Sequence, residues 1–188
     1  MTSFTVPAES PGAACASSLA PELSEAMRGL TTAIYTYSKL PVRVAEGARM
    51  RIAQINGCLV CKDFRAASDL EALLESLDAS ATETIATRGP APDEEFYRNV
   101  ADWRTSPLYS DRERLAIEYA ERFSLAPDPL GYDDEFWGRV KAAFTEAEIK
   151  DLTICMAGWV AGGRYYHVLG LDQACGVEGP ALAPEAAE

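Results

Sequence analysis

Cys58 and Cys61 are the residues of this 188-residue sequence whose type and spacing most directly indicate chemistry. In a water-soluble chain, a CxxC pair serves a redox reaction, forms half of a zinc site, or is buried as two small hydrophobic residues. Asn56-Gly57 signals the end of one helix, and apolar periodicity resumes at Cys58. The free N–H groups and positive dipole end of a helix starting there would lower the pKa of a thiol. The pattern favours a pair that cycles between dithiol and disulfide.

Helices are the elements expected to position this pair, because apolar residues recur at helical spacing and no window shows strand alternation. The predicted helices cover residues 23–34, 42–55, 58–77, 93–103 and 133–144, with two more beginning at Ser110 and Thr145. Three capping boxes support helix starts: Ser80 with Glu83, Ser110 with Glu113, and Thr145 with Glu148. The Thr145 helix is apolar nearly all round and is therefore predicted to be the buried central helix.

The chain is long enough for one domain with a sizeable core. We expect a loose N-terminal arm over residues 1–20, a helical domain over 21–171 and an acidic, Ala/Pro-rich tail over 172–188. The fold class is all-α, a bundle of about six to eight helices. An offset of 102 residues superposes Glu148 on Glu46 and His167 on Arg65, so an internal two-fold duplication is one interpretation of the pattern.

Composition and charge exclude several classes of protein. Hydrophobic content of 48% and charged content of 24% are typical of globular proteins. The net charge of −12 disfavours nucleic acid and anionic membrane surfaces as partners. The N-terminus lacks the pattern of a secretory signal, and the longest apolar run, 154–163, is too short to span a bilayer. Five cysteines, an odd number, fit a reducing compartment, so a cytoplasmic location is expected.

Two charged residues flank the CxxC pair at distances that would let them meet. Glu46 lies ten residues before Asn56, and Arg65 lies eight after Gly57, so an antiparallel helix pair would place them opposite each other. Arg65 also follows Cys61 by one helical turn. The functional interpretation is a polar cluster around Cys61; the alternative is an ordinary salt bridge between helices.

The only histidine and the remaining cysteines leave other interpretations open. His167, late in the Thr145 helix, is either an imidazole that reaches the CxxC pair from another helix or a packed histidine with no catalytic role. A structural zinc site needs four ligands, and Cys15, Cys155 and Cys175 form no second close pair with His167, so no metal and no cofactor are expected.

Residues 41–66, PVRVAEGARMRIAQINGCLVCKDFRA, resemble the signature of the alkyl hydroperoxidase D (AhpD)-like, carboxymuconolactone decarboxylase family, and the resemblance covers about residues 23–173. It implies an all-helical fold, a homo-oligomer, and an antioxidant thiol peroxidase cycle. In that cycle Cys61 attacks a hydroperoxide, Cys58 closes the disulfide, and Glu46 begins a proton relay. A dithiol partner, such as a lipoylated or thioredoxin-like protein, would reduce the disulfide again.

One departure from the family pattern affects the expected mechanism. Arg65 occupies the position of the family's relay histidine, and arginine keeps its proton at any accessible pH. It can stabilise a thiolate but cannot relay a proton. The helix position favours Cys58 as the more acidic thiol, whereas the resemblance implies Cys61 as the nucleophile. A lactone decarboxylase-like lyase and a non-catalytic helical oligomer with a vestigial CxxC remain as alternatives.

Overall fold

The computed structural model describes residues 21–174 and contains only helices and loops in that range, which confirms the all-α prediction. Six helices have ten residues or more: α2 (Pro21–Tyr37), α3 (Val42–Asn56), α5 (Ala66–Ser76), α7 (Asp111–Leu125), α9 (Asp134–Ala143) and α10 (Glu146–Val168). Shorter elements join them: α4 (Leu59–Asp63), α6 (Glu94–Arg98), α8 (Pro127–Leu130), α11 (Leu171–Ala174) and the 3-10 helices η1 (Ile85–Thr87) and η2 (Asn99–Asp102).

The central helix is α3, and the prediction that the Thr145 helix would be central is wrong. Helix α3 packs against α7 on one side and α10 on another, and most of its residues are buried, including the charged Glu46 and Arg49. Helix α10 is apolar almost all round, yet Ile154 and Val168 are exposed on it. The apolar sequence of α10 therefore predicted a long helix correctly, but it did not predict which helix lies at the centre of the fold.

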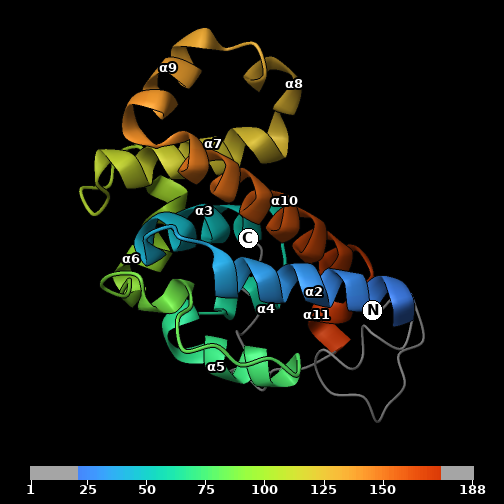
Figure 1. Ribbon diagram of the computed structural model, residues 1–188. Coiled ribbons are helices and arrows are strands. Elements are labelled where there is room, and N and C mark those ends of the chain that lie inside the picture. Colours follow the sequence, from blue (N-terminus) through green and yellow to red (C-terminus); the bar gives the residue numbers. More distant parts are fainter. Residues whose placement is uncertain (1–20, 175–188) are drawn as a thin grey trace, which may run out of the picture.

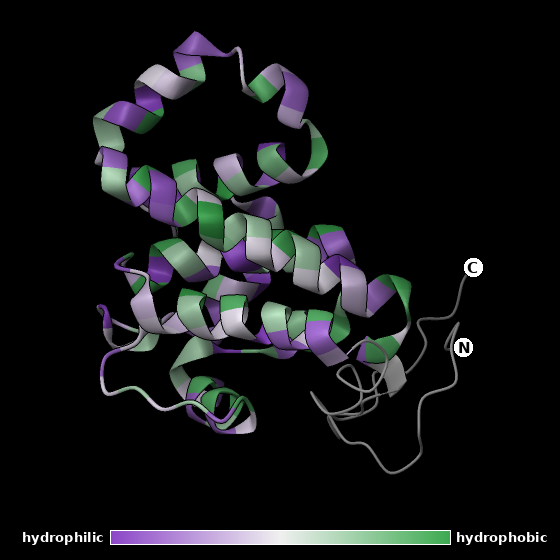
Figure 2. Ribbon diagram, turned by 45° about the vertical axis from the view of Figure 1, so that its right-hand side comes forward, coloured by the Kyte–Doolittle hydropathy of each residue, from purple (hydrophilic) through white to green (hydrophobic). Residues whose placement is uncertain are grey.

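The remaining helices surround α3 on several sides. In Figure 1, α2 runs alongside α10, while α8 and α9 lie beyond α7 at one end of the molecule and α5 lies at the other. Hydrophilic and hydrophobic residues alternate along most of these helices in Figure 2, as expected for helices with one buried face. This arrangement brings α2, α4, α5 and α10 together around one end of α3.

The CxxC pair follows a sharp break that the sequence signalled. Gly57 caps the end of helix α3 in a left-handed conformation (φ 73°), which glycine adopts at little cost because it has no Cβ. The helix predicted over residues 58–77 is wrong as a single element, because Phe64 and Arg65 are extended and divide it into α4 and α5. Polar side chains bind the backbone at the break: Asp69 accepts from the Arg65 amide, and Arg49 donates to the Phe64 carbonyl. These bonds replace helical ones.

Two of the three predicted capping boxes occur. Ser110 and Thr145 begin α7 and α10 with the reciprocal bonds expected. The box at Ser80 with Glu83 is wrong, since a capping box between Thr84 and Thr87 begins η1 instead. The element starts where Ile85 enters the core, and the polar residues before it stay in a loop.

Candidate functional site

Cys58 and Cys61 form a disulfide in the structure, with their Cα atoms 5.3 Å apart. Cys58 is the N-cap of α4, and its sulfur accepts a hydrogen bond from the Cys61 amide at 3.3 Å. Cys58 is completely buried, whereas Cys61 is partly exposed. Because α4 has only five residues, the long helix dipole expected behind the pair is absent. The two sulfurs therefore differ mainly in their exposure, with Cys61 the more accessible to a ligand.

Cys61 lines a cavity of about 460 Å³ between α2, α3, α4, α5 and α10. Most of its lining is apolar or aromatic: Met27, Tyr35, Ile52, Val60, Phe64, Leu73, Trp159 and Tyr166. Cys58 is not part of the lining. A molecule that enters this cavity can thus approach Cys61 without contact with Cys58.

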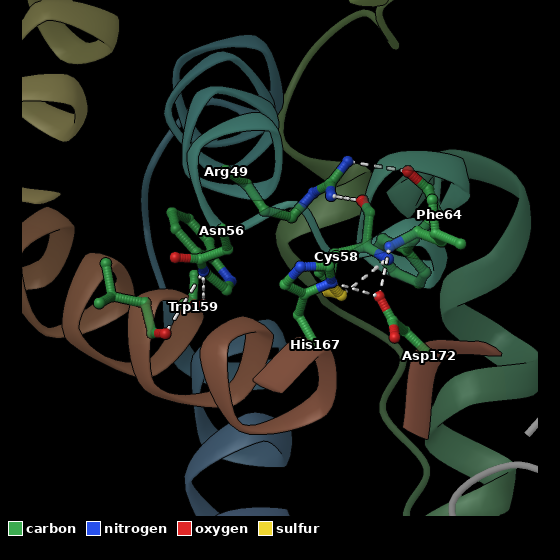
Figure 3. Close-up of a disulfide and its surroundings, with 10 residues drawn as sticks. Arg49, Asn56, Cys58, Phe64, Trp159, His167 and Asp172 are labelled. Atoms are coloured by element: carbon green, nitrogen blue, oxygen red, sulfur yellow. Dashed lines mark hydrogen bonds and ion pairs between the residues drawn. A yellow bond between two sulfur atoms is a disulfide. The ribbon is translucent and has the colours of Figure 1, made fainter. Parts of the chain in front are cut away.

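A buried ion pair lies beneath the CxxC segment. Both Glu46 carboxylate oxygens accept bonds from Arg49, at 2.6 and 3.1 Å, and both side chains are almost completely buried. Arg49 also donates to the carbonyls of Cys61 at 2.5 Å and Phe64 at 2.8 Å (Figure 3). Burial lowers the pKa of Arg49, but the charge and hydrogen bonds of Glu46, with smaller contributions from Tyr35 and Tyr97, together hold this pKa above its ordinary value, so the guanidinium stays charged. Arg49 thereby holds α4 onto α3.

Glu46 has two further donors that complete its shell. The Tyr97 hydroxyl donates at 2.7 Å and the Ala66 amide at 3.3 Å, both to Oε2. Burial, followed by the neighbouring Glu46 carboxylate, raises the pKa of Tyr97 above its ordinary value, so the hydroxyl keeps the proton that it donates. With four hydrogen bonds from three residues, Glu46 is tied into the fold.

Arg65 does not meet Glu46, so the expected contact between the two is wrong. Its guanidinium binds Glu94 through two bonds, at 2.8 and 3.0 Å, and this pairing raises the pKa of Arg65 and lowers that of Glu94. It also lies 4.1 Å above the Tyr97 ring. The break between α4 and α5 explains the difference, because Arg65 no longer sits one helical turn beyond Cys61. Tyr97 is the residue that Arg65 and Glu46 share, because Arg65 lies over its ring and Glu46 accepts from its hydroxyl.

His167 reaches the CxxC segment from α10, on the side away from Arg49 (Figure 3). Its Nδ1 lies 3.0 Å from Asp172 Oδ2, and the same oxygen accepts from the Leu59 amide at 3.0 Å. A Cβ added to Gly57 would lie 2.9 Å from His167 Nε2. His167 therefore lies against Gly57, and Asp172 binds Leu59, so the two side chains contact the residues on both sides of Cys58.

Sequence reasoning missed Arg49, Tyr97 and Asp172. Arg49 lies three residues after Glu46 on the same helix, a spacing that signals a pair. Tyr97 carries no such local signal, because 51 residues separate it from Glu46. Asp172 was assigned to the tail, yet it is buried in α11 and packs against the start of α4.

The other cysteines lie away from the disulfide or outside the described residues. Cys155 is free and buried, and burial, aided by Asp151, raises the pKa of its thiol to about 12. Cys15 and Cys175 fall outside residues 21–174. Within that range no three His, Cys, Asp or Glu side chains cluster as metal ligands would, and no helix has the length and apolarity to cross a membrane.

Comparisons with known proteins agree with the fold. No family model matches the sequence. A stretch of 54 residues is 50% identical to the uncharacterised protein YnjA of Escherichia coli (strain K12), and it spans 29% of each chain. The structure is similar to that of a protein of unknown function from Agrobacterium tumefaciens, for which a role as the antioxidant defence protein AhpD is suggested. The TM-score is 0.62 at 19% identity, over 82% of this chain and 92% of that one, so the two proteins share an AhpD-like helical fold.

Proposed function

We propose that this protein is a thiol-dependent peroxidase, or disulfide oxidoreductase, that reduces hydroperoxides through a cycle at Cys58 and Cys61. The observation that carries the proposal is the unequal placement of the two bonded sulfurs: Cys61 lines the apolar cavity, and Cys58 is buried behind it. The AhpD-like fold and the suggested antioxidant role of the Agrobacterium protein support it.

On the basis of this placement, the proposal gives each sulfur a different role. The Cys61 thiolate attacks the terminal oxygen of the hydroperoxide, the O–O bond breaks, and an alcohol leaves after taking a proton. The resulting sulfenic acid on Cys61 is then attacked by Cys58, which forms the disulfide and releases water. A dithiol partner, of the lipoylated or thioredoxin-like kind, takes the disulfide back to two thiols and becomes oxidised itself.

Glu46 contributes by holding the motif, which differs from the relay that the resemblance implied. Its carboxylate is occupied by Arg49, Tyr97 and the Ala66 amide. Arg49 in turn holds the carbonyl of Cys61. This chain of contacts fixes the backbone of the reactive cysteine, while Arg65 is occupied by Glu94.

Turnover of an organic hydroperoxide with dithiothreitol as reductant tests the proposal. Cys61→Ser and Cys58→Ser are each expected to lower the rate by about 100-fold or more, because the cycle needs both sulfurs. Cys155→Ser is the matched control and should keep the rate, since its buried thiol is not a thiolate. Five unreacted thiols after prolonged exposure of the reduced protein would contradict the proposal and favour the non-catalytic alternative. Full activity of Cys58→Ser on an acidic lactone would favour the lyase.

A further inference from the structure

His167 on α10 and Asp172 on α11 form a bonded pair beside the buried Cys58. We propose that His167, oriented by Asp172, exchanges a proton with Cys58 each time the Cys58–Cys61 disulfide opens or closes. This inference rests on the proposed disulfide cycle and assigns the proton step that Arg65 cannot perform. His167 is the proton carrier, and Asp172 is a positioning residue.

Contacts on both sides of Cys58 place the pair. The imidazole edge that carries Nε2 faces Gly57, where an added Cβ would meet Nε2, Cε1 and Cδ2 within 3.3 Å. Asp172 Oδ2 holds the Leu59 amide. In Figure 3 the side chains of His167 and Asp172 lie beside Cys58. A glycine is required before Cys58 because any larger residue would displace the imidazole.

Asp172 also selects the form of the imidazole that can act as a base. Its carboxylate accepts at Nδ1, so the neutral ring carries its proton there and leaves Nε2 with a free lone pair. The Asp172 side chain is completely buried, and no described residue donates to its Oδ1. The His167 side chain is 42% exposed, so the ring can return protons to solvent.

Among residues 21–174, Asp172 is the charged residue that bonds to the imidazole. Asp172 approaches from α11 and Cys58 from the start of α4. Arg164, one turn earlier on α10, donates instead to Asn56 and to the Ser124 carbonyl. Asp172 and Cys58 thus lie beside the ring, whereas Arg164 is bound elsewhere.

The proton balance follows in both directions. On reduction, a thiolate of the dithiol partner attacks Cys61, the S–S bond breaks, and its electron pair passes to Cys58, which takes a proton from the imidazolium. The partner's second thiolate then attacks the mixed disulfide, Cys61 leaves as a thiolate, and the partner is released with its own disulfide. On closure, Cys58 gives its proton to Nε2, and its thiolate attacks the sulfenic acid on Cys61. The departing hydroxide takes a proton from solvent to form water, and the exposed imidazolium returns its proton to solvent.

Ultraviolet thiolate absorbance as a function of pH tests the assignment in the full-length, reduced chain. Cys61→Ala leaves Cys58 as the only cysteine of the pair, and Cys58→Ala leaves Cys61. Each background is measured with and without His167→Asn, whose amide can still donate to Asp172. Loss of a cation next to a thiolate moves its titration by about one pH unit or more. We therefore expect His167→Asn to move the Cys58 curve upwards by about one unit and to leave the Cys61 curve in place.

His167→Gln serves as a second variant should the first reduce the folded fraction, which circular dichroism monitors. An unmoved Cys58 curve in a folded variant, or equal movement of both curves, would overturn the proposal. Because no peroxide is used, absence of peroxidase turnover leaves the result unaffected, and the two proposals fail separately.

Discussion

The disulfide lies between two polar groups that differ in how completely their hydrogen bonds are satisfied. On one side, Glu46 and Arg49 are buried and hold each other as well as the backbone of α4. On the other side, His167 is partly exposed and bonds through one ring nitrogen to Asp172. A saturated carboxylate stabilises a structure, whereas an imidazole with a free nitrogen can move a proton. The comparison favours a structural role for Glu46, the residue that the resemblance implied as the relay, and the proposed proton exchange lies on the His167 side.

Glu46→Gln gives the largest expected effect, because it leaves Arg49 charged and buried without its partner. Breaking a buried pair in this way costs about 3–5 kcal/mol of unfolding free energy. Urea denaturation measures the loss. A cost below that of an exposed pair would show that the Glu46 side is not structural.

Tyr97→Phe removes one of the donors to the same carboxylate and should cost about 1.5–3 kcal/mol at neutral pH. The raised pKa of Tyr97 adds a pH dependence. The folded state keeps a proton that the unfolded tyrosine releases near pH 10, so this contribution is present below about pH 10 and is lost as the pH rises further. When the pH is raised from below to above about pH 10, the urea midpoint should fall less in Tyr97→Phe than in the unchanged protein. Equal slopes for both proteins would contradict the assignment.

Gly57→Ala probes the His167 side. An L-residue in the left-handed region costs about 1–2 kcal/mol, and the new methyl group would also displace the imidazole. Gly89→Ala is the matched control, since Gly89 has a positive φ of 106° with open space around it. Both variants should lose stability, but Gly57→Ala alone should slow reduction of the disulfide by dithiothreitol. Equal reduction rates would show that the imidazole position is unimportant.

Glu94→Gln should have the smallest effect and completes the comparison. It makes the same substitution as Glu46→Gln in a two-bond pair with an arginine, but the Glu94 side chain is 61% exposed. Exposed pairs contribute about 0–1 kcal/mol. If urea denaturation shows a loss as large as that of Glu46→Gln, burial does not explain the difference between the two pairs.

Much of the fold was predictable, because amphipathic spacing and capping boxes are local signals. The helix end at Gly57 and the starts at Ser110 and Thr145 were found in this way. The break after α4 was not predicted, because the hydrogen bonds that stabilise it include one from Arg49, which lies on another helix. No glycine or proline marks the break at Phe64 and Arg65 in the sequence.

The candidate site was predictable only in part for the same reason. Cys58 and Cys61 were evident from their spacing, and they are joined in the structure. The partners of Glu46 and Arg65 were not, because an antiparallel pairing of two uninterrupted helices was assumed. Asp172 lies in a stretch with tail-like composition, and only its packing against α4 shows that it belongs to the site.

Trapping of a sulfenic acid tests the central claim most directly. In reduced Cys58→Ser, a hydroperoxide should convert Cys61 to a sulfenic acid that dimedone labels, because no partner sulfur remains to close the disulfide. In Cys61→Ser, the buried Cys58 should stay unlabelled. Mass spectrometry of the peptide that contains both positions reads the result. Label on Cys58 in the second variant, or none on Cys61 in the first, would contradict the division of roles between the two sulfurs.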